Sequence, residues 1–277
     1  MKSNDLPLFY VILGTPRSER RSVLADLIAD GLDADDRALT FLSEQEPASD
    51  FDQQLGEVRK WGWQDHAIVA DIPDSIADAS DADAAGKRYS HVFFIADGSQ
   101  NPVDQIEAIK AWIAPFDVEF ARVITVIDCT LASQHRELTA WWDACVHFSD
   151  VVLLSHRQGV PNKWMSDFQA RYRDKFIPAL FEFVKEGKVK NPALVLEPQA
   201  RRVTHVFDQD DIDWSVARSL APEAEIDFDT DDEEGEELPE GGGAGEGVPE
   251  VDPYFERRQN GSRVIELPDV RKFLNHA

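Results

Sequence analysis

This sequence has few cysteines, few basic residues relative to acidic ones, and no long apolar run. Among its 277 residues there are two cysteines, Cys129 and Cys145, and neither belongs to a C-x-x-C pair. Two isolated cysteines in apolar surroundings are typical of reduced core thiols and argue against a disulfide framework. We therefore expect two buried thiols in a cytoplasmic protein.

Segments that would place the chain in or across a membrane are also missing. A membrane-spanning helix needs about 18 consecutive apolar residues, and no stretch of this sequence approaches that length. The first residues, Met1–Asp5, lead directly into an apolar stretch without the cationic and apolar regions of a signal peptide. These absences favour a cytoplasmic location and no membrane partner.

Negative charge dominates the composition. The chain has 53 acidic and 28 basic residues, which gives a formal net charge of −25. A surface of this kind repels nucleic acid and anionic membranes, so we expect neither as a partner. Much of the excess lies in residues 223–250, where an acidic run is followed by Gly241–Gly243. Such a segment buries too little apolar surface to offset its ordering entropy, which predicts a disordered linker.

Residues 8–185 alternate short apolar runs with amphipathic stretches. Near-continuous apolar strands separated by helices predict a mostly parallel sheet with helices on both faces, which is a three-layer α/β fold. We expect one helix that begins near Ser18 and three more over Val103–Ala114, Leu138–His147 and Asn162–Glu186. The expected strands are Phe9–Leu13, Ala38–Ser43, Ala67–Ala70, His91–Ile95, Arg122–Ile127 and Val151–Leu154, with residues 77–86 as a helix end or loop.

The pattern weakens after Lys190, which predicts four parts. Residues 1–190 form the α/β domain, and residues 191–222 an extension packed on it, with Ala193–Leu196 and Arg202–Phe207 as short strands or extended segments. Residues 223–250 form the linker. Residues 251–277 regain apolar side chains, including Tyr254 and Phe255, and a helical turn is expected at Val270–Leu274. We interpret this last part as a docking segment for its own domain or for a partner protein.

The first strand leads into a phosphate-binding frame whose consensus side chains have changed. The pattern G-x-x-x-x-G-K-[ST] aligns without a gap, with Gly14 as the first glycine. Glu19 stands at the second glycine, Arg20 at the lysine and Arg21 at the hydroxyl that holds Mg²⁺. Backbone N–H groups in such a turn wrap a phosphate, and Glu19 places a side chain and a negative charge against that anion. Ser22 could supply the hydroxyl only if the loop shifted by one residue.

Four segments in order resemble the GTPase domain of the CobW family, P-loop proteins related to the hydrogenase- and urease-maturation GTPases and linked to metal delivery. Residues 14–24 resemble that family's G-F-L-G-A-G-K-T-T-L-L, and residues 95–102 resemble its I-E-T-[TS]-G-x-A-D-P segment read from the glutamate, with Gly98 and Pro102 matching. Residues 123–128 resemble V-V-T-V-V-D. Residues 148–158 resemble F-A-D-V-I-L-L-N-K-x-D, the guanine-reading loop.

The resemblance implies a P-loop NTPase-like sheet with a nucleotide site, and the substitutions argue against an ordinary site. In the guanine-reading loop, Ser155, His156 and Gln158 replace Asn, Lys and Asp. Losing a charged bidentate contact weakens base discrimination by about 2 kcal/mol or more. The family's C-x-C-C metal motif is absent because no cysteine precedes Cys129. We therefore expect no metal site and no catalytic residue. If nucleotide binding is retained, the candidate residues are Gly14, Arg17, Ser18, Arg20, Arg21, Ser22, Asp97, Gly98, Asp128, Ser155 and Gln158.

Simpler structural roles compete with each of these candidates. Arg17, Arg20 and Arg21 either hold an anion or form a solvated helix start, although cations there oppose the helix dipole. Asp97 and Asp128 end apolar strands, where α/β sites form, but Asp128 could equally cap the next turn. The histidines His135, His147 and His156 lack helical metal spacing. The tryptophans favour core or interface over a cofactor site.

Three functions remain open at this point. The leading hypothesis is a non-hydrolysing pseudo-GTPase that needs no cofactor and acts on an unidentified protein partner. The alternative is a nucleotide-dependent metallochaperone or GTPase that uses GTP and Mg²⁺ through Arg20, Ser22, Asp97 and Asp128. The third is an enzyme for sugars or nucleotides in which Arg20 and Arg21 hold a different phosphate.

Overall fold

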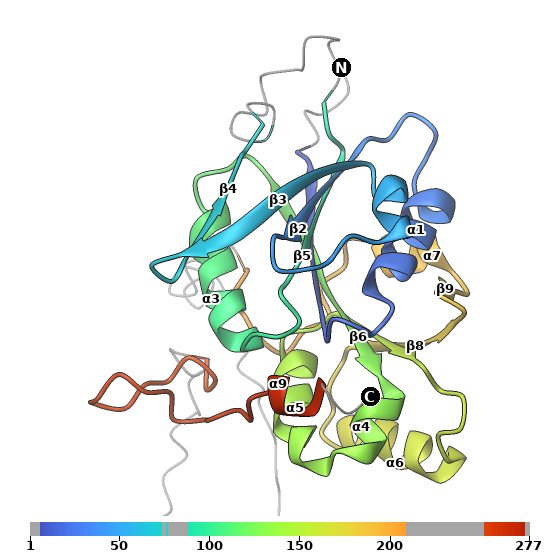
Figure 1. Ribbon diagram of the computed structural model, residues 1–277, viewed down its shortest axis with the longest axis vertical. Helices are drawn as coiled ribbons and strands as arrows, with labels where there is room; N and C mark the ends of the chain where they lie inside the picture. The colour runs from blue at the N-terminus through green and yellow to red at the C-terminus, as the bar shows by residue number, and fades with distance from the viewer. Residues whose placement is uncertain (1–5, 74–75, 77–87, 209–251, 275–277) are drawn as a thin grey trace, which may run out of the picture.

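A central β-sheet organises the protein in the computed structural model, which describes residues 6–73, 76, 88–208 and 252–274 (Figure 1). Its nine strands are β1 Leu8–Gly14, β2 Ala38–Ser43, β3 Glu57–Gln64, β4 Ala67–Ala70, β5 His91–Ile95, β6 Glu119–Asp128, β7 Val151–Ser155, β8 Leu180–Lys185 and β9 Lys188–Val189. They lie in the order β4-β3-β2-β5-β1-β6-β7-β8-β9. All neighbours pair in parallel except β3 with β4 and β8 with β9, which form antiparallel hairpins at the two edges.

Helices cover both faces of the sheet because β1 is apolar on both sides. Phe9, Val11 and Leu13 join one core cluster, and Tyr10 and Ile12 join the other. The first cluster includes residues of α3 Pro102–Ile113, α4 Cys129–Gln134, α5 Thr139–His147 and α6 Asn162–Arg173, and the second includes α1 Arg20–Gly31 and α7 Pro192–Leu196. The three-layer α/β fold predicted from the sequence is therefore confirmed. The remaining helices of the described residues are the 3₁₀ turns η1 Asp50–Gln54 and η2 Arg136–Leu138, and α9 Arg271–Leu274.

The register of the central strands brings several loops together. Ile12 of β1 lies opposite Ile95 of β5 and Ile124 of β6, and all three strands run in the same direction. β6 also pairs in parallel with β7, so that Asp128 lies opposite Ser155. The carboxyl ends of β1, β5, β6 and β7 therefore meet at one edge, which is where parallel α/β sheets place their sites.

The sequence prediction is wrong for two strands on the sheet's outer parts. The helix expected over Asn162–Glu186 ends at Arg173, and β8 follows and pairs with β7. Phe176 has a left-handed φ of 55° and Pro178 lacks an N–H, so the helix cannot continue through them. β3 was not predicted because most of its side chains are polar or half-exposed, while Trp61 alone is fully buried.

A third error concerns Ala193–Leu196, which form helix α7 in place of a strand or extended segment. Pro192 occupies the first helical position, and the side chain of Asn191 accepts the Leu194 N–H at 3.3 Å. At the other end, the guanidinium of Arg122 donates to the carbonyls of Leu194 (2.7 Å) and Val195 (3.0 Å). These contacts satisfy both ends of a helix that is too short to be stable alone.

The remaining sequence predictions have mixed outcomes. The helical turn expected at Val270–Leu274 is present as α9, and residues 202–207 form no regular strand. Cys129 and Cys145 are buried thiols, as predicted, and burial raises the pKa of Cys129 to about 12. Within the part of the chain that the structure describes, no helix is both long and apolar enough to cross a membrane. The expected loop at residues 77–86 and the linker at 223–250 lie outside the described residues.

Candidate functional site

The turn between β1 and α1 has a left-handed residue where the phosphate-binding pattern has its second glycine. Glu19 adopts φ 65° and ψ 17° immediately before the first residue of α1. An L residue pays a steric penalty in this region that glycine avoids, and Glu19 makes no side-chain cap hydrogen bond to α1. The turn thus combines a backbone conformation that suits glycine with a carboxylate side chain.

Gly14, at the end of β1, and Gly98, in the segment after β5, lie where the two segments touch. A Cβ atom added to Gly98 would lie 2.5 Å from the carbonyl oxygen of Gly14 and 2.6 Å from the Pro16 nitrogen. A Cβ atom on Gly14, which has φ 134°, would lie 2.4 Å from the Val126 oxygen. Ser18 is buried and donates to the Thr15 carbonyl at 2.8 Å. The segment after β5 is therefore packed directly against the turn backbone.

Arg20, at the lysine position, points into the protein. Its side chain is 1% exposed, and its two terminal nitrogens donate to the Ala96 carbonyl and to Oε1 of Glu46. Burial lowers the pKa of Arg20, and the negative charges of Glu46 and Asp97 oppose that shift. The positive charge of Arg20, which could attract a phosphate, is already balanced by Glu46 inside the protein.

Arg21 shares the same carboxylate. It donates to Oε2 of Glu46 at 2.8 Å, to Oδ1 of Asp52 at 3.1 Å and to the Pro47 carbonyl at 2.7 Å. Two buried guanidiniums thus meet two carboxylates from the segment after β2. The solvated helix start considered from the sequence is wrong for Arg20 and Arg21, which are 2% and 9% exposed, whereas Arg17 is exposed.

Ser155, at the start of the base-reading segment, holds the turn in place. It is fully buried, and its Oγ lies within hydrogen-bond distance of the carbonyls of Ser18 (3.1 Å) and Ile127 (3.0 Å), to either of which its one proton can be donated. The contact with Ser18 joins two segments that are 137 positions apart. The hydroxyl therefore acts within the fold and is not presented to a base.

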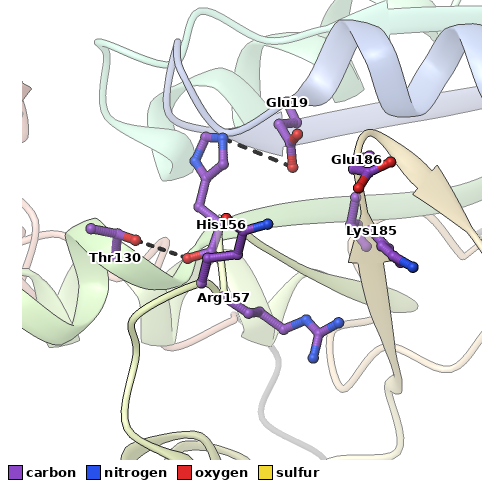
Figure 2. Close-up of a pocket in the computed structure, with 8 residues that line it drawn as sticks. Glu19, Thr130, His156, Arg157, Lys185 and Glu186 are labelled. Atoms are coloured by element: carbon purple, nitrogen blue, oxygen red, sulfur yellow. Dashed lines mark hydrogen bonds and ion pairs between the residues drawn. The ribbon is translucent and has the colours of Figure 1, made fainter.

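His156 links the same loop to two carboxylates. Its Nδ1 lies 3.0 Å from Oδ2 of Asp128. Its Nε2 lies 3.9 Å from Oε2 of Glu19, the contact drawn in Figure 2. Asp128 also accepts the Leu131 N–H at 3.0 Å, so it caps α4 as one of the two sequence interpretations held. The hydroxyl of Thr130 donates to the His156 carbonyl and supports this left-handed residue, which has φ 46°.

Two cavities flank Glu19 at this edge of the sheet. One of about 360 Å³ lies on the side of the β7 loop, and Figure 2 shows Glu19, His156 and Glu186 around it. Its other lining residues include Thr130, Arg157, Gln158 and Lys185. The second, of about 600 Å³, lies on the side of the Glu46 loop, and its lining includes Arg17, Arg20, Arg21, Ser22, Glu46 and Phe51. Glu19 and Glu186 line both cavities.

The residues present do not fit a magnesium–nucleotide complex held in the usual way. Arg21 has no hydroxyl, and the hydroxyl of Ser22 donates to the Glu19 carbonyl at 2.9 Å. A Cβ atom on Gly187, in the β8–β9 turn, would lie 2.7 Å from the Ser22 Cβ, so this turn crowds that residue. Asp97 is buried, with Oδ1 accepting from Ser99 and Oδ2 unpaired. Among the described residues, no cluster of three His, Cys, Asp or Glu could hold a metal ion.

The structure gathers most of the predicted site residues at one edge, but their role in nucleotide binding stays a prediction. Gln158 is exposed on the smaller cavity, and the others contact the turn or the loops around it. Sequence reasoning missed Glu46 and Asp52 as partners of the arginines. Their position directly after β2 could have indicated this role. β2 pairs in parallel with β5, so the carboxyl end of β2 lies near the turn after β1.

Comparisons with known proteins give few matches. No family model and no curated protein matches the chain. Among solved structures, it is similar to Zn(II)-bound YjiA GTPase from E. coli, with 13% identity over 71% of this chain and 67% of that chain and a TM-score of 0.42. It is also similar to a Zn(II)-bound triple mutant of YjiA GTPase, with 14% identity over 76% and 70% and a TM-score of 0.44. The architecture itself rests on the strand order and register given above.

Proposed function

We propose that the chain is a degenerate, CobW-like P-loop protein that does not hydrolyse GTP and acts through contacts with another protein. The observation that carries this proposal is the shared carboxylate of Glu46, which pairs with both Arg20 and Arg21. An incoming phosphate would have to displace a buried carboxylate from its two cations. Leaving such a charge buried without its partners costs about 3–5 kcal/mol, which opposes phosphate binding.

The contacts of Ser22 and Asp128 argue against hydrolysis. Phosphoryl transfer needs a metal ion held beside the phosphates and a positioned water. Ser22, the remaining hydroxyl at the start of α1, is engaged with Glu19, and Asp128 is engaged with Leu131 and His156. The framework of strand, turn and helix thus persists, with Arg20 and Arg21 paired to Glu46 and with Asp128 bound to Leu131 and His156.

Nucleotide titration tests the proposal directly. We expect GTP, GDP and ATP with Mg²⁺ to leave the melting temperature unchanged and to give no heat in calorimetric titration. A ligand at 100 times its Kd stabilises the folded state by about 2.7 kcal/mol, so bound nucleotide would be visible. A single-turnover assay should detect no phosphate release. Stoichiometric turnover of GTP by the purified chain would overturn the proposal.

A restored variant supplies the matched positive control. It combines Glu19→Gly, Arg20→Lys and Arg21→Thr with Glu46→Gln, so that the turn regains glycine, lysine and hydroxyl without an unpaired buried carboxylate. If these substitutions account for the lost chemistry, this variant should gain a nucleotide-dependent rise in melting temperature that the parent chain lacks.

The second candidate function is a GTP-dependent metallochaperone or GTPase with atypical ligands. Three observations favour it: the left-handed turn at Glu19, the cavities on either side of that residue, and the unpaired Oδ2 of buried Asp97. A saturable rise in melting temperature with any nucleotide in the parent chain would establish this function over the first. Equilibrium dialysis against Zn²⁺, with and without GTP, would then test metal binding.

A further inference from the structure

The C-terminal segment, residues 252–274, lies against helices α3 and α5 through a small set of anchoring side chains. It is the red trace in Figure 1, which ends in α9. The ring of Tyr254 lies 4.8 Å from that of His147, and the ring of Phe255 is stacked 5.7 Å from that of Phe148. Val270 is 2% exposed. These apolar anchors all contact the end of α5 or the core cluster beneath it.

A buried arginine clamps the same segment to α3. Arg263 is 7% exposed, and it donates to Oδ1 of Asp104 (2.8 Å) and Oε2 of Glu107 (2.5 Å). Arg257 reaches the same Glu107 oxygen at 2.7 Å. At the start of the segment, the carboxylate of Asp252 lies 2.8 Å from Nε2 of His147. Two arginines of the segment thus face the carboxylates of Asp104 and Glu107 on α3.

The segment has little secondary structure of its own. One isolated bridge joins Arg257 and Arg263, and α9 is a single helical turn. No strand of the segment joins the central sheet in the described chain. Its attachment therefore rests on aromatic rings packed at the end of α5, on Arg257 and Arg263 paired with carboxylates of α3, and on the contact of Asp252 with α5. Aromatic and arginine side chains are the types that contribute most of the binding energy where one protein surface holds another.

We propose that the face formed by α3 and α5 is a peptide-binding site, and that residues 252–274 are its resident ligand. The segment leaves the face as a unit and is replaced by a peptide of the same chemistry, with two adjacent aromatic residues followed by an arginine. The acidic pair Asp104 and Glu107 selects for that arginine, and the ring of Phe148 selects for the aromatic pair. This inference concerns a different face from the turn after β1 and stands whether or not a nucleotide binds there.

The test uses a fluorescently labelled peptide of residues 252–274 and the full chain. In wild type, the attached segment competes at a high effective concentration, so the added peptide should bind weakly. In the double variant Phe255→Ala/Arg263→Ala, the attached segment loses two of its anchors while the face is intact. We expect this variant to bind the peptide at least about ten-fold tighter than wild type, as measured by fluorescence anisotropy.

Matched controls separate the face from general charge effects. Adding Asp104→Lys and Glu107→Lys to the double variant should abolish peptide binding, whereas adding Asp167→Lys, an exposed carboxylate on α6, should not. A labelled peptide carrying Arg263→Glu should bind none of these proteins. Circular dichroism and thermal unfolding establish that each variant is folded.

The outcomes are decisive in either direction. Equal peptide binding by wild type and the double variant, or binding by neither, would overturn the proposal. A wild-type dimer that dissociates when peptide is added would overturn the assignment of the segment to its own chain. Hydrogen exchange on wild type provides a second measurement that needs no variant. The amides of residues 252–274 should exchange together and faster than those of α3 and α5, and exchange at the rate of global unfolding would contradict separate release.

Discussion

Arg20 and Glu46 form a buried ion pair between the first helix and the segment after the second strand, with side chains 1% and 6% exposed. The pair joins residues 26 positions apart and lies where the phosphate-binding pattern has its lysine. Because Arg21 binds the other oxygen of the same carboxylate, Glu46 balances two cations. Two arginines that could bind an external anion are thus paired with a carboxylate of the same chain in the protein interior.

Replacing Glu46 should strongly destabilise the protein. In Glu46→Gln, the guanidiniums of Arg20 and Arg21 stay buried without their shared negative charge, and we expect a loss of about 3 kcal/mol in the free energy of unfolding. Urea denaturation measures this change. Asp50→Asn, an exposed neighbour in η1, is the control and should change stability by less than about 0.5 kcal/mol.

The same variant should also gain an anion dependence. Phosphate should raise its melting temperature more than it raises that of wild type, since the arginines have lost their internal partner. A Glu46→Gln protein as stable as wild type and indifferent to phosphate would contradict the role assigned to this carboxylate.

Replacing Glu19 with glycine should stabilise the turn after β1. The residue has φ 65°, where glycine has no steric penalty. We expect the free energy of unfolding to rise by about 1 kcal/mol, reduced by the loss of the weak contact with His156. His66→Gly is a matched control, because His66 has φ 66° and is exposed in the turn between β3 and β4. Thermal unfolding should show both variants shifted upward, and a destabilised Glu19→Gly would mean that its side-chain contacts outweigh the backbone strain.

Removing the hydroxyl of Ser155 should loosen the turn at a distance. Ser155→Ala leaves the buried carbonyls of Ser18 and Ile127 without this donor, which costs about 1–3 kcal/mol. Hydrogen exchange should show faster exchange around residues 15–19. Ser133→Ala removes a half-buried hydroxyl that bonds within α4, and it should leave exchange in the turn unchanged. Unaltered protection of the turn in Ser155→Ala would refute this coupling.

The contact between Asp252 and His147 predicts a loss of stability in acid. Burial raises the pKa of Asp252, but hydrogen bonds from His147, Thr204 and the Tyr254 backbone outweigh it and hold the pKa below its ordinary value. A lowered carboxyl pKa contributes stability above the unfolded-state value of about 3.9, and the contribution is lost as pH falls through the folded-state value. Wild type should therefore be more stable than Asp252→Asn at pH 7, and the difference in melting temperature should close below about pH 4. A difference that is constant with pH would exclude this carboxylate as the cause.

Both thiols should be inert in the folded protein. Cys129 and Cys145 are fully buried, and burial raises both pKa values, so little thiolate is present at pH 8. A colourimetric thiol reagent should react slowly in buffer and rapidly with two thiols in denaturant. Fast reaction of either thiol in the native state would show local opening of α4 or α5.

The strands of the central sheet were predictable because their side chains are apolar on both faces. β1, β5 and β7 are buried along nearly their whole length, and a strand covered by helices on both sides needs that composition. β3 and β8 lie towards the edges, where half-exposed polar residues conceal the pattern. α7 was not predictable because the capping of its carbonyls comes from Arg122, far away in the sequence.

By itself, the sequence determined the central strands β1, β2, β5, β6 and β7 and the place of the turn after β1, since hydrophobic period and glycine position act locally. It also determined which residues replace the phosphate-binding side chains. Only the tertiary structure decided where those side chains point. Arg20 and Arg21 turn toward Glu46 because β2 pairs with β5 beside β1, and that pairing brings a carboxylate from another segment within hydrogen-bond distance. Local sequence cannot specify such a contact, because its energy depends on burial and on partners supplied by the rest of the chain.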